Sequence, residues 1–366
     1  MKHFIVGPVE MYPCTKEVYK DGIVYFRTPD FSNIVFECLN KLSNLIGNNE
    51  SNSLVYLTAS GPAAMEAVVE NSVFDDDKVL VINGGTFGKR FCELMKYHNK
   101  NYDSIDLAWG EVLTGDLLYK YDNQGYTMLF VNLHETSVGH LYDIELLSEF
   151  CKKNNMMLVV DAISTFLADD YNMQRYEIDC TIASSQKGLC LSAGLSFIST
   201  SKRMKDKMLR CPKASSCYFD LKDYFKNIER GQTPYTPAVG IVYELKAILD
   251  YIDSVGGKEV WLKKIEEKAM YFRKKALQLG YNIPKYPLSN MLTPLIFDNV
   301  KATEIVAELK NRYQIYVNPC GGDLADKIIR ISHIGNTTIE DIDDLFEKMQ
   351  LVIKDLKNKE LMYDWK

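Results

Sequence analysis

Residues 54–90, LVYLTASGPAAMEAVVENSVFDDDKVLVINGGTFGKR, contain the pattern that decides the fold. Two short, continuously apolar runs, Leu54–Leu57 and Val79–Ile82, predict buried strands, and Pro62–Asn71 between them predicts a helix. A strand, a helix and a second strand in this order are typical of a parallel sheet that is covered by helices on both faces. We therefore expect an α/β fold.

The same alternation continues along the chain. It predicts further strands at Ser104–Leu107, Met128–Val131, Leu158–Val160, Cys180–Ala183 and Ser196–Ser199, with helices at Lys89–Tyr97 and Ile144–Asn154. An irregular stretch, Cys211–Thr236, then precedes a helical block, 238–280, that breaks at Gly256-Gly257. The last part predicts strands at Leu295–Phe297, Ile315–Val317 and Ile328–Ser332 and helices at Thr303–Arg312 and Ile339–Leu356, which is a small α+β domain.

Composition excludes several classes of protein. The 366 residues are 46% hydrophobic and 25% charged, so a disordered chain or a small disulfide-stapled scaffold is excluded. The formal net charge of -6 argues against a nucleic-acid scaffold. The nine cysteines are scattered and predict neither a disulfide framework nor a metal site. With no signal peptide or membrane-spanning run in the sequence, we expect a cytoplasmic protein.

Lys187 is the most informative single residue because of what surrounds it. It follows the predicted strand Cys180–Ala183 and lies among small or apolar residues, from Ser184 to Ala193. A solvated loop lysine is one interpretation, but such lysines usually have polar neighbours. A lysine among apolar groups has a lowered pKa and becomes an amine nucleophile, as a Schiff-base lysine requires.

Asp161 directly follows the predicted strand Leu158–Val160, 26 residues before Lys187. An aspartate in this position is often only the N-cap of a helix. In parallel α/β sheets, however, ligands bind at the carboxyl ends of the strands. A lysine that binds an aldehyde and a carboxylate that keeps a pyridine nitrogen protonated together suit pyridoxal phosphate.

Two small-residue turns follow the strands of the opening segment. In the first, Ser60 and Gly61 let the backbone N–H groups of a helix N-terminus approach an anion, although helix capping explains them equally well. In the second, glycines flank Phe87, whose ring either packs in the core or faces a flat ligand.

Two later segments complete the set of candidates. His134-Glu135-Thr136 follows the Met128–Val131 strand; a lone histidine there is more typical of the core than of catalysis, and the segment has no metal constellation. Arg330 lies in the apolar strand Ile328–Ser332 and needs an anionic partner. That partner is either a structural carboxylate or a substrate carboxylate bound bidentately.

In this order, the segments resemble the class V pyridoxal-phosphate aminotransferases, in particular the serine–pyruvate, alanine–glyoxylate and 2-aminoethylphosphonate–pyruvate branch. The resemblance begins at Gly7-Pro8 and ends at Arg330–Gly335, and Ser185–Leu189 with the upstream Asp161 is its most specific part. It implies fold type I of the pyridoxal-phosphate-dependent transferases, with a mostly parallel seven-stranded sheet in a large domain and a small C-terminal α+β domain. The implied division is an N-terminal arm at 1–20, a large domain at 21–255 and a small domain at 256–366.

The resemblance also implies a role for each candidate residue. Lys187 binds the cofactor aldehyde, Asp161 pairs with the ring nitrogen, and Phe87 stacks on the ring. The phosphate-binding positions are those of Ser60, Gly61, Pro62 and Gln186, and Thr136 lies beside the cofactor. Thr236 reaches the phosphate of a partner subunit, and Arg330 binds the substrate carboxylate. The sequence departs from the family pattern at Pro62, where relatives often carry Thr or His, at Thr233, where an aromatic residue is common, and at Ser332, where Gly is common.

The activity that the resemblance implies is transamination by a homodimer. An amino group passes from alanine, serine, aspartate or 2-aminoethylphosphonate to a 2-oxo acid such as pyruvate or glyoxylate, with ping-pong kinetics. The alternative is a pyridoxal-phosphate lyase of the same fold, either a cysteine desulfurase, for which Cys320 would have to be reactive on a mobile loop, or a kynureninase-like enzyme. A non-catalytic binding protein would have no use for Lys187 combined with Asp161.

Overall fold

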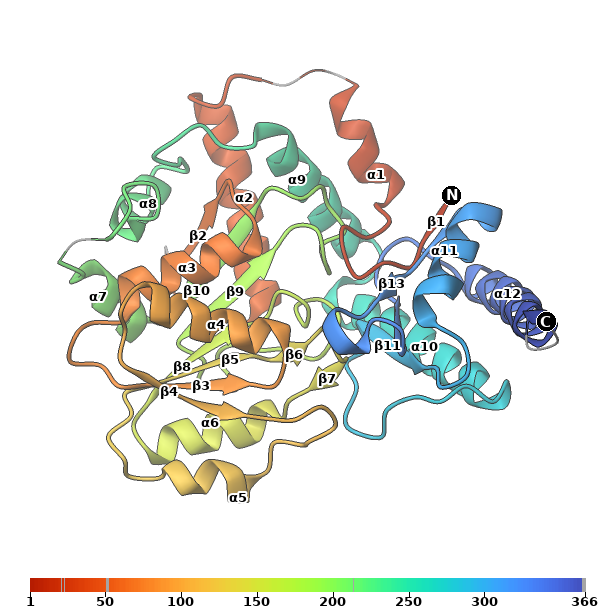
Figure 1. Cartoon of the computed structure of the whole chain (residues 1–366). Helices are drawn as coiled ribbons and strands as arrows, with labels where there is room; N and C mark the ends of the chain where they lie inside the picture. The colour runs from red at the N-terminus through yellow and green to blue at the C-terminus, as the bar shows by residue number, and fades with distance from the viewer. Residues whose placement is uncertain (21, 23, 51–52, 213, 364–366) are drawn as a thin grey trace.

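A seven-stranded sheet forms the centre of the larger part of the molecule (Figure 1). The computed structural model describes residues 1–366 except 21, 23, 51–52, 213 and 364–366, and it leaves the side chains of 359–363 undescribed. The strands run in the order β2 (Leu54–Leu57), β10 (Ser196–Thr200), β9 (Cys180–Ser184), β8 (Met157–Asp161), β5 (Met128–Asn132), β3 (Val79–Asn83) and β4 (Tyr102–Asp106). This confirms the mostly parallel seven-stranded sheet that the sequence predicts.

The exception to the parallel arrangement is β10, which is antiparallel to both β2 and β9. A parallel crossover needs a connection of about a dozen residues or more, usually containing a helix. The connection from β9 to β10, residues 185–195, has no helix, so the chain turns back and Ser196 pairs with Ser184. Lys187 lies on this turn.

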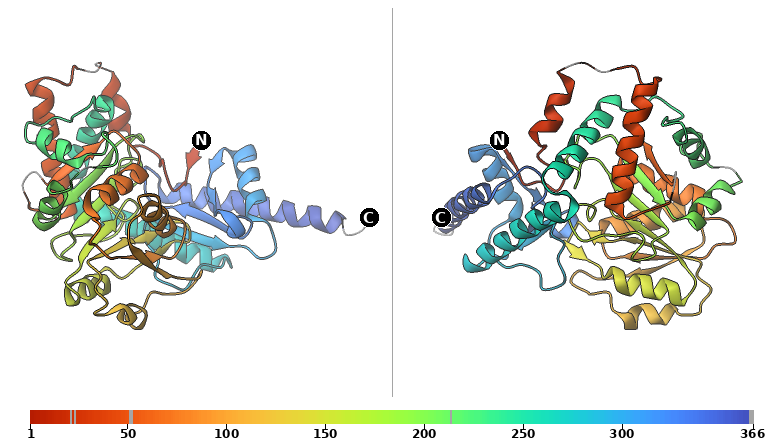
Figure 2. Two further views of the ribbon diagram at one scale, coloured as in Figure 1. Left: turned by 60° about the vertical axis from the view of Figure 1, so that its left-hand side comes forward. Right: turned by 180° about the vertical axis from the view of Figure 1, so that it is seen from behind.

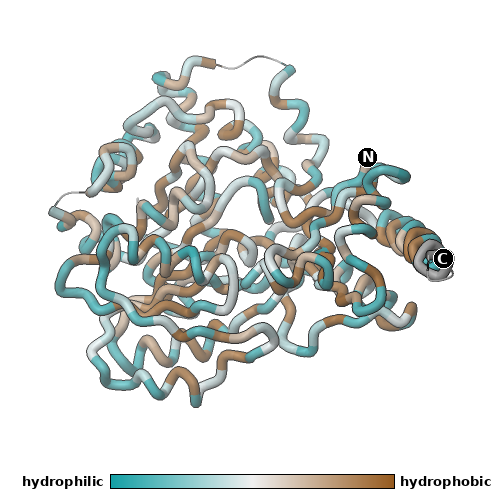
Figure 3. The backbone as a smooth tube through the Cα atoms, viewed as in Figure 1, coloured by the Kyte–Doolittle hydropathy of each residue, from teal (hydrophilic) through white to brown (hydrophobic). Residues whose placement is uncertain are grey.

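Helices cover both faces of the sheet (Figure 2). α3 (Gly61–Ser72) and α4 (Thr86–Tyr97) pack on one face, and α2 (Pro29–Ile46) and α9 (Val239–Ser254) lie on the other. The remaining helices of this part are α1 (Pro13–Lys16), α5 (Gly115–Leu118), α6 (Ile144–Lys153), α7 (Lys202–Leu209) and α8 (Leu221–Ile228). Because helices cover both faces, the central strands β5, β9 and β10 are buried throughout, and the hydropathy colouring shows apolar residues in this part of the sheet (Figure 3).

The C-terminal part has its own smaller sheet, in which β11 (Leu292–Ile296), β14 (Ile328–Ser332) and β13 (Asn318–Pro319) are antiparallel. It is packed by α10 (Gly257–Gln278), α11 (Ala302–Tyr313) and α12 (Ile339–Tyr363). The N-terminal strand β1 (Lys2–His3) pairs in parallel with β12 (Ile315–Tyr316), so Phe4 enters the core of the C-terminal part. The first residues of the chain therefore cross from the small sheet toward the large one.

Two local predictions need correction. The stretch 211–236, predicted to be irregular, contains α8, because Asp220 caps a short amphipathic turn whose Leu221, Phe225 and Ile228 are buried. The helix predicted to begin at Lys89 begins at Thr86, so Phe87 lies in its first turn and not in the preceding loop. Among the described residues, no helix is long and apolar enough to cross a membrane.

Candidate active site

The site forms where the strands of the large sheet end. Asp161 is the last residue of β8 and pairs in register with Asn132 on β5 and Ile182 on β9. Gly61, at the start of α3, approaches the segment after β8 so closely that a Cβ atom there would lie 2.4 Å from Cδ1 of Ile163. The absence of a side chain at Gly61 thus lets the N-terminus of α3 reach the end of β8.

Lys187 is buried on the β9–β10 connection, with only 9% of its surface exposed. Its Nζ donates a hydrogen bond to the carbonyl of Val6 at 2.7 Å, and Gly7 leaves room for its side chain. Burial and the positive charge of Arg330 lower the pKa of the Lys187 amine to about 8, against the opposing effect of Asp161. The buried lysine with a lowered pKa that the sequence predicts is confirmed. The sequence did not predict that the N-terminal arm would line the site.

The carboxyl group of Asp161 is completely enclosed. Its Oδ1 accepts a hydrogen bond from the backbone N–H of Ile163 at 2.8 Å, and no lysine or arginine among the described residues lies within ion-pair distance. Burial raises the pKa of Asp161 to about 7, the Ile163 bond opposes this, and the negative charge of Glu135 adds to it. A cation placed against this carboxyl group would restore its charged form.

Arg330 extends from β14 of the small sheet toward the same region. Nη1 donates to the carbonyl of Thr136 at 3.1 Å and Nη2 to that of Pro319 at 2.8 Å, whereas the buried Nε has no hydrogen-bond partner. In the described part of the chain, no carboxylate forms an ion pair with Arg330. The structural carboxylate that the sequence left open as a partner is therefore not there, and the guanidinium charge is available to an anion.

Glu135 is a residue of the site that the sequence reasoning passed over. It belongs to the short strand β6 (His134–Glu135), which pairs with β7 (His140–Leu141), and it is fully buried. Its carboxylate accepts hydrogen bonds from the backbone N–H groups of Phe87, at 3.3 Å, and Gly88, at 3.1 Å, and from Ser137. It thereby holds the first turn of α4, which carries Phe87. The signal in the sequence that could have indicated Glu135 was its position directly after the candidate histidine.

The residues on either side of Glu135 are also buried. Burial and the charge of Lys187 lower the pKa of His134 to about 3, so its ring is neutral. The Thr136 hydroxyl lies 2.9 Å from the Ser164 hydroxyl, and the Thr136 carbonyl receives the Arg330 bond. The His134–Thr136 segment therefore links the end of β5 to the arginine of the small sheet.

The remaining predicted residues differ in how they are placed. Ser60 is the exposed N-cap of α3, and its side chain makes no capping hydrogen bond; Pro62 is exposed on the first turn, and Phe87 is half-buried. The Oε1 atom of Gln186 is buried without a partner. Thr236 is exposed, and its loop reaches the end of β2, where the Ala238 N–H binds the Thr58 hydroxyl at 2.9 Å.

Cys320 lies beside Arg330, but its surroundings do not favour a reactive thiol. The residue is buried, and its Sγ donates to the carbonyl of Ser137 at 2.7 Å. Burial raises the pKa of the Cys320 thiol, with a smaller opposing effect from Arg330. A desulfurase cysteine has to be a thiolate that can move toward its substrate, and this arrangement provides neither property.

A separate hollow of about 940 Å³ lies at the opposite end of the strands. Met156, Asp179 and Ser201 form part of its lining. Its buried carboxylate is already satisfied, because Asp179 accepts hydrogen bonds from Arg203, from the Ser201 hydroxyl and from the backbone N–H of Leu158. Unpartnered buried atoms of Asn132, Ser184 and Gln186 lie at or just after the carboxyl ends of the strands, beside Asp161, which makes that end the candidate active site.

Comparisons with known proteins identify the family of the chain. Residues 24–345 match the family described as Aminotransferase class-V. An uncharacterized aminotransferase of Methanocaldococcus jannaschii is 28% identical over 370 aligned residues, which cover 96% of this chain and 92% of that protein. Serine–glyoxylate aminotransferase of Hyphomicrobium methylovorum is 24% identical over 343 residues, covering 91% and 84% of the two chains.

The fold is shared with solved structures. The crystal structure of alanine–glyoxylate aminotransferase from a Nostoc species superposes with a TM-score of 0.90 over 96% of this chain and 94% of that one, at 24% sequence identity. At this identity the superposition shows the common fold, including the seven-stranded sheet, and leaves substrates to be argued from the site.

Proposed function

The chain belongs to the class V aminotransferase family of pyridoxal-phosphate-dependent transaminases, and on that premise we propose that it moves the amino group of a small amino acid to a 2-oxo acid. The observation that carries the proposal is the convergence of the buried Lys187 and Asp161 with the partly buried Arg330, none of which forms an ion pair in the described chain. A lysine and a carboxylate in this state suit a cofactor with an aldehyde and a basic ring nitrogen, and the guanidinium suits a substrate that bears a carboxylate.

The residues fit the cofactor that the family implies. Close to Asp161, the buried Oδ1 of Asn132, Oγ of Ser184 and Oε1 of Gln186 have no hydrogen-bond partner among the described residues. Buried polar atoms are normally paired, so such a group of atoms indicates a polar ligand. Asn132 is the register partner of Asp161, and Ser184 lies near Gly61.

In the proposed complex, the Lys187 amine carries the cofactor and Asp161 pairs with its ring nitrogen. Ser60, Gly61, Pro62 and Gln186 surround the phosphate, and Phe87 and Thr136 lie against the ring. When bound, pyridoxal phosphate withdraws electrons from the substrate Cα, so that the Cα proton becomes removable. The backbone N–H groups at the start of α3 favour the phosphate charge there.

The proposed role of Lys187 in turnover is to move a proton. A base works best when its pKa is near the working pH, and burial has lowered the pKa of this amine to about 8. A substantial fraction of Nζ is then neutral near pH 8 and can accept the proton from the Cα atom of the amino donor. The enclosure of Lys187 by the N-terminal arm keeps water away from this step.

Arg330 is the proposed receptor for the substrate carboxylate. Its two Nη groups are held by backbone carbonyls, which fixes the plane of the guanidinium while Nε remains unpartnered. A carboxylate bound through Nε and a neighbouring Nη would compensate the buried charge in a bidentate geometry. Alanine and serine, as donors, and glyoxylate and pyruvate, as acceptors, each carry such a carboxylate.

The proposal includes the division of the chain and its assembly. A large domain at 21–255 and a small domain at 256–366 are proposed around two hydrophobic cores, although residues after 255, such as Trp261 and Ile334, also pack in the larger core. The arm at 1–20 supplies Phe4 to one core and Val9 to the other. The proposed active unit is a homodimer in which Thr236 contacts the phosphate bound by the partner subunit. The exposure of Thr236 in the single chain is consistent with such a contact.

The test is a screen of half-reactions with the purified protein and pyridoxal phosphate. Alanine, serine, aspartate and 2-aminoethylphosphonate are each added alone while the visible absorption of the bound cofactor is followed; glyoxylate or pyruvate is then added. We expect alanine or serine to remove the band and glyoxylate to restore it. Release of sulfide from cysteine, lost in Cys320→Ser, would overturn the proposal in favour of a lyase.

Lys187→Ala is the negative control of this screen and should show no visible band from a covalently bound cofactor. The matched variant is Lys152→Ala, which removes an exposed lysine paired with Glu177 and should behave as the unmodified protein does.

A further inference from the structure

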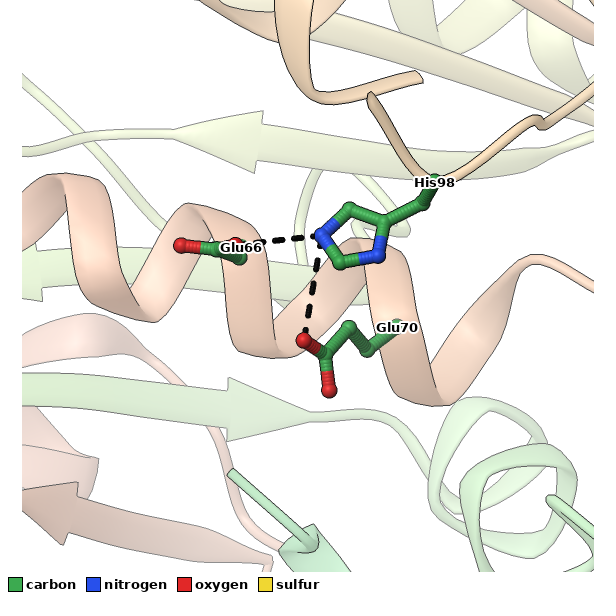
Figure 4. Close-up of side chains that lie close together, drawn as sticks. All are labelled: Glu66, Glu70 and His98. Carbon is green, nitrogen blue, oxygen red and sulfur yellow. Dashed lines mark hydrogen bonds and ion pairs between the residues drawn. The ribbon is translucent and has the colours of Figure 1, made fainter. Parts of the chain in front are cut away.

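Glu66, Glu70 and His98 form a compact cluster outside the proposed active site (Figure 4). Glu66 and Glu70 are four residues apart on α3 and therefore project from the same face of the helix. His98 directly follows α4, and its ring lies over that face. One oxygen of each carboxylate and Nε2 of the histidine lie within 4.8 Å of one another.

The cluster has more negative charge than it has partners. Nε2 of His98 is 3.1 Å from Oε1 of Glu66 and 3.7 Å from Oε1 of Glu70, so a single ring N–H faces two carboxylates and reaches only one at hydrogen-bond distance. The other described residues contribute no lysine or arginine within ion-pair distance of either carboxylate. With a neutral imidazole, two negative charges are left to be compensated, which is the charge of one divalent cation.

Glu70 provides a second, independent sign of a ligand. Its side chain is only 2% exposed, and the cationic group that faces it among the described residues is the His98 ring, 3.7 Å away, which it shares with Glu66. Its Oε2 accepts hydrogen bonds from the backbone N–H of Ser216, at 3.2 Å, and from the Ser216 hydroxyl, at 3.4 Å. These bonds orient the carboxylate and leave Oε1 directed at Nε2, too far away for a hydrogen bond. Metal-binding carboxylates are commonly held by outer hydrogen bonds of this kind.

The spacing of the donor atoms suits a transition metal. In a tetrahedral site with metal–ligand bonds of about 2.0 Å, the ligand atoms are about 3.3 Å apart. The two nitrogen–oxygen distances, 3.1 and 3.7 Å, lie on either side of this value. An imidazole combined with two carboxylates favours Zn²⁺ and its neighbours over Mg²⁺ or Ca²⁺, which prefer oxygen ligands alone.

We propose that Glu66, Glu70 and His98 bind one divalent transition-metal ion, with zinc as the representative ion. The metal takes the place of the proton on Nε2, which passes to solvent, and water completes the coordination on the side where Glu66 is 30% exposed. The ion would cross-link α3 to the end of α4. These two helices also carry Gly61 and Phe87 in their first turns. The proposed role of the ion is structural, and the ion takes no part in the transamination chemistry.

The experiment measures metal stoichiometry and stability on the full, cofactor-loaded chain without a polyhistidine tag. The protein is stripped with EDTA, incubated with Zn²⁺ and desalted, and the metal is counted by mass spectrometry. We expect one equivalent of zinc per chain and a thermal midpoint raised by roughly 3 °C when zinc is in hundredfold excess over its dissociation constant.

His98→Ala and Glu66→Gln should each weaken zinc binding at least tenfold and abolish the thermal shift. His3→Ala is the matched control, because it removes a histidine that faces a single carboxylate, Glu10, and it should bind zinc as the unmodified protein does. Glu66→Gln is isosteric at a partly exposed position, so it decides the matter if His98→Ala does not fold. An unmodified protein that binds no zinc, or variants that keep the full affinity, would overturn the proposal and leave the cluster an ordinary ion pair.

Discussion

A buried aspartate lies at each end of β8 and β9, and the two differ in how completely their carboxyl groups are hydrogen-bonded. At the amino end, Asp179 accepts hydrogen bonds from a guanidinium, a hydroxyl and a backbone N–H. At the carboxyl end, Asp161 has one backbone bond, and its pKa is raised to about 7 by burial. The satisfied carboxylate stabilises the fold, whereas we propose that the unsatisfied one binds a ligand. A cavity therefore identifies a functional site less well than unpaired buried charge does.

Exchanging the two aspartates for asparagine should separate these roles most clearly. Asp161→Asn should lower kcat of transamination roughly 10³-fold, because an amide cannot hold a ring nitrogen protonated. Asp179→Asn should leave kcat unchanged and lower the free energy of unfolding by about 2 kcal/mol, because it weakens a buried charge pair. Steady-state kinetics and urea unfolding of both variants measure the contrast. Equal losses of activity in the two would contradict it.

The raised pKa of Asp161 predicts how stability depends on pH in the protein without cofactor. Its ordinary value is 3.8 and its folded value about 7, so the stability that this group contributes is present below about pH 4 and is lost as the pH rises through 7. The gain from Asp161→Asn in the free energy of unfolding should therefore grow between pH 4 and 7, to at most about 4 kcal/mol at 1.36 kcal/mol per pKa unit. Urea unfolding at a series of pH values tests this. A gain independent of pH would show that the carboxyl group is not buried as described.

The two arginines extend the comparison to cations. Arg330 has no carboxylate partner in the described chain, whereas Arg203 is paired with Asp179. Arg330→Gln should lower kcat/KM about 10²-fold, mainly through KM, because the substrate carboxylate loses a bidentate charged partner. Arg203→Gln should leave kcat/KM unchanged. If KM does not move in Arg330→Gln, the carboxylate is bound elsewhere.

Glu135 should show the smallest of these effects, since it acts through the helix that it holds. In Glu135→Gln, one acceptor for the N–H groups of Phe87, Gly88 and Ser137 is lost, and we expect kcat/KM to fall about tenfold. The absorption maximum of the bound cofactor should also shift, which a merely structural defect would not cause. Asp77→Asn, at the amino end, removes a carboxylate that binds Lys207 and should affect stability alone. An unshifted spectrum in Glu135→Gln would remove its positioning role.

Local patterns in the sequence were sufficient for much of the architecture. Largely apolar runs predicted the strands of the large sheet, because strands that helices cover on both faces are buried on both sides. The same regularity failed between Cys211 and Thr236, where prolines on either side hid the two turns of α8. The positions of Lys187 and Asp161 could be predicted because Asp161 ends one strand and Lys187 lies shortly after another, and parallel strands bring their carboxyl ends together.

Contacts between distant segments could not be predicted in this way. The hydrogen bond from Lys187 to Val6 joins residues 181 positions apart, and the three groups of the proposed metal site come from α3 and from the residue that follows α4. Nothing in the local sequence shows that Glu135 reaches the first turn of α4 or that Cys320 is tied to Ser137.

By itself, the sequence determined the α/β architecture and pointed to two of the proposed reactive groups, because periodicity and strand ends are local properties of the chain. Only the tertiary structure decided which buried charges are paired and which are left open. Burial and pairing depend on all the segments packed around a group, so Asp161 and Asp179 look alike in the sequence and differ in the folded protein. That difference, more than the residue types, places the proposed chemistry at one end of the sheet.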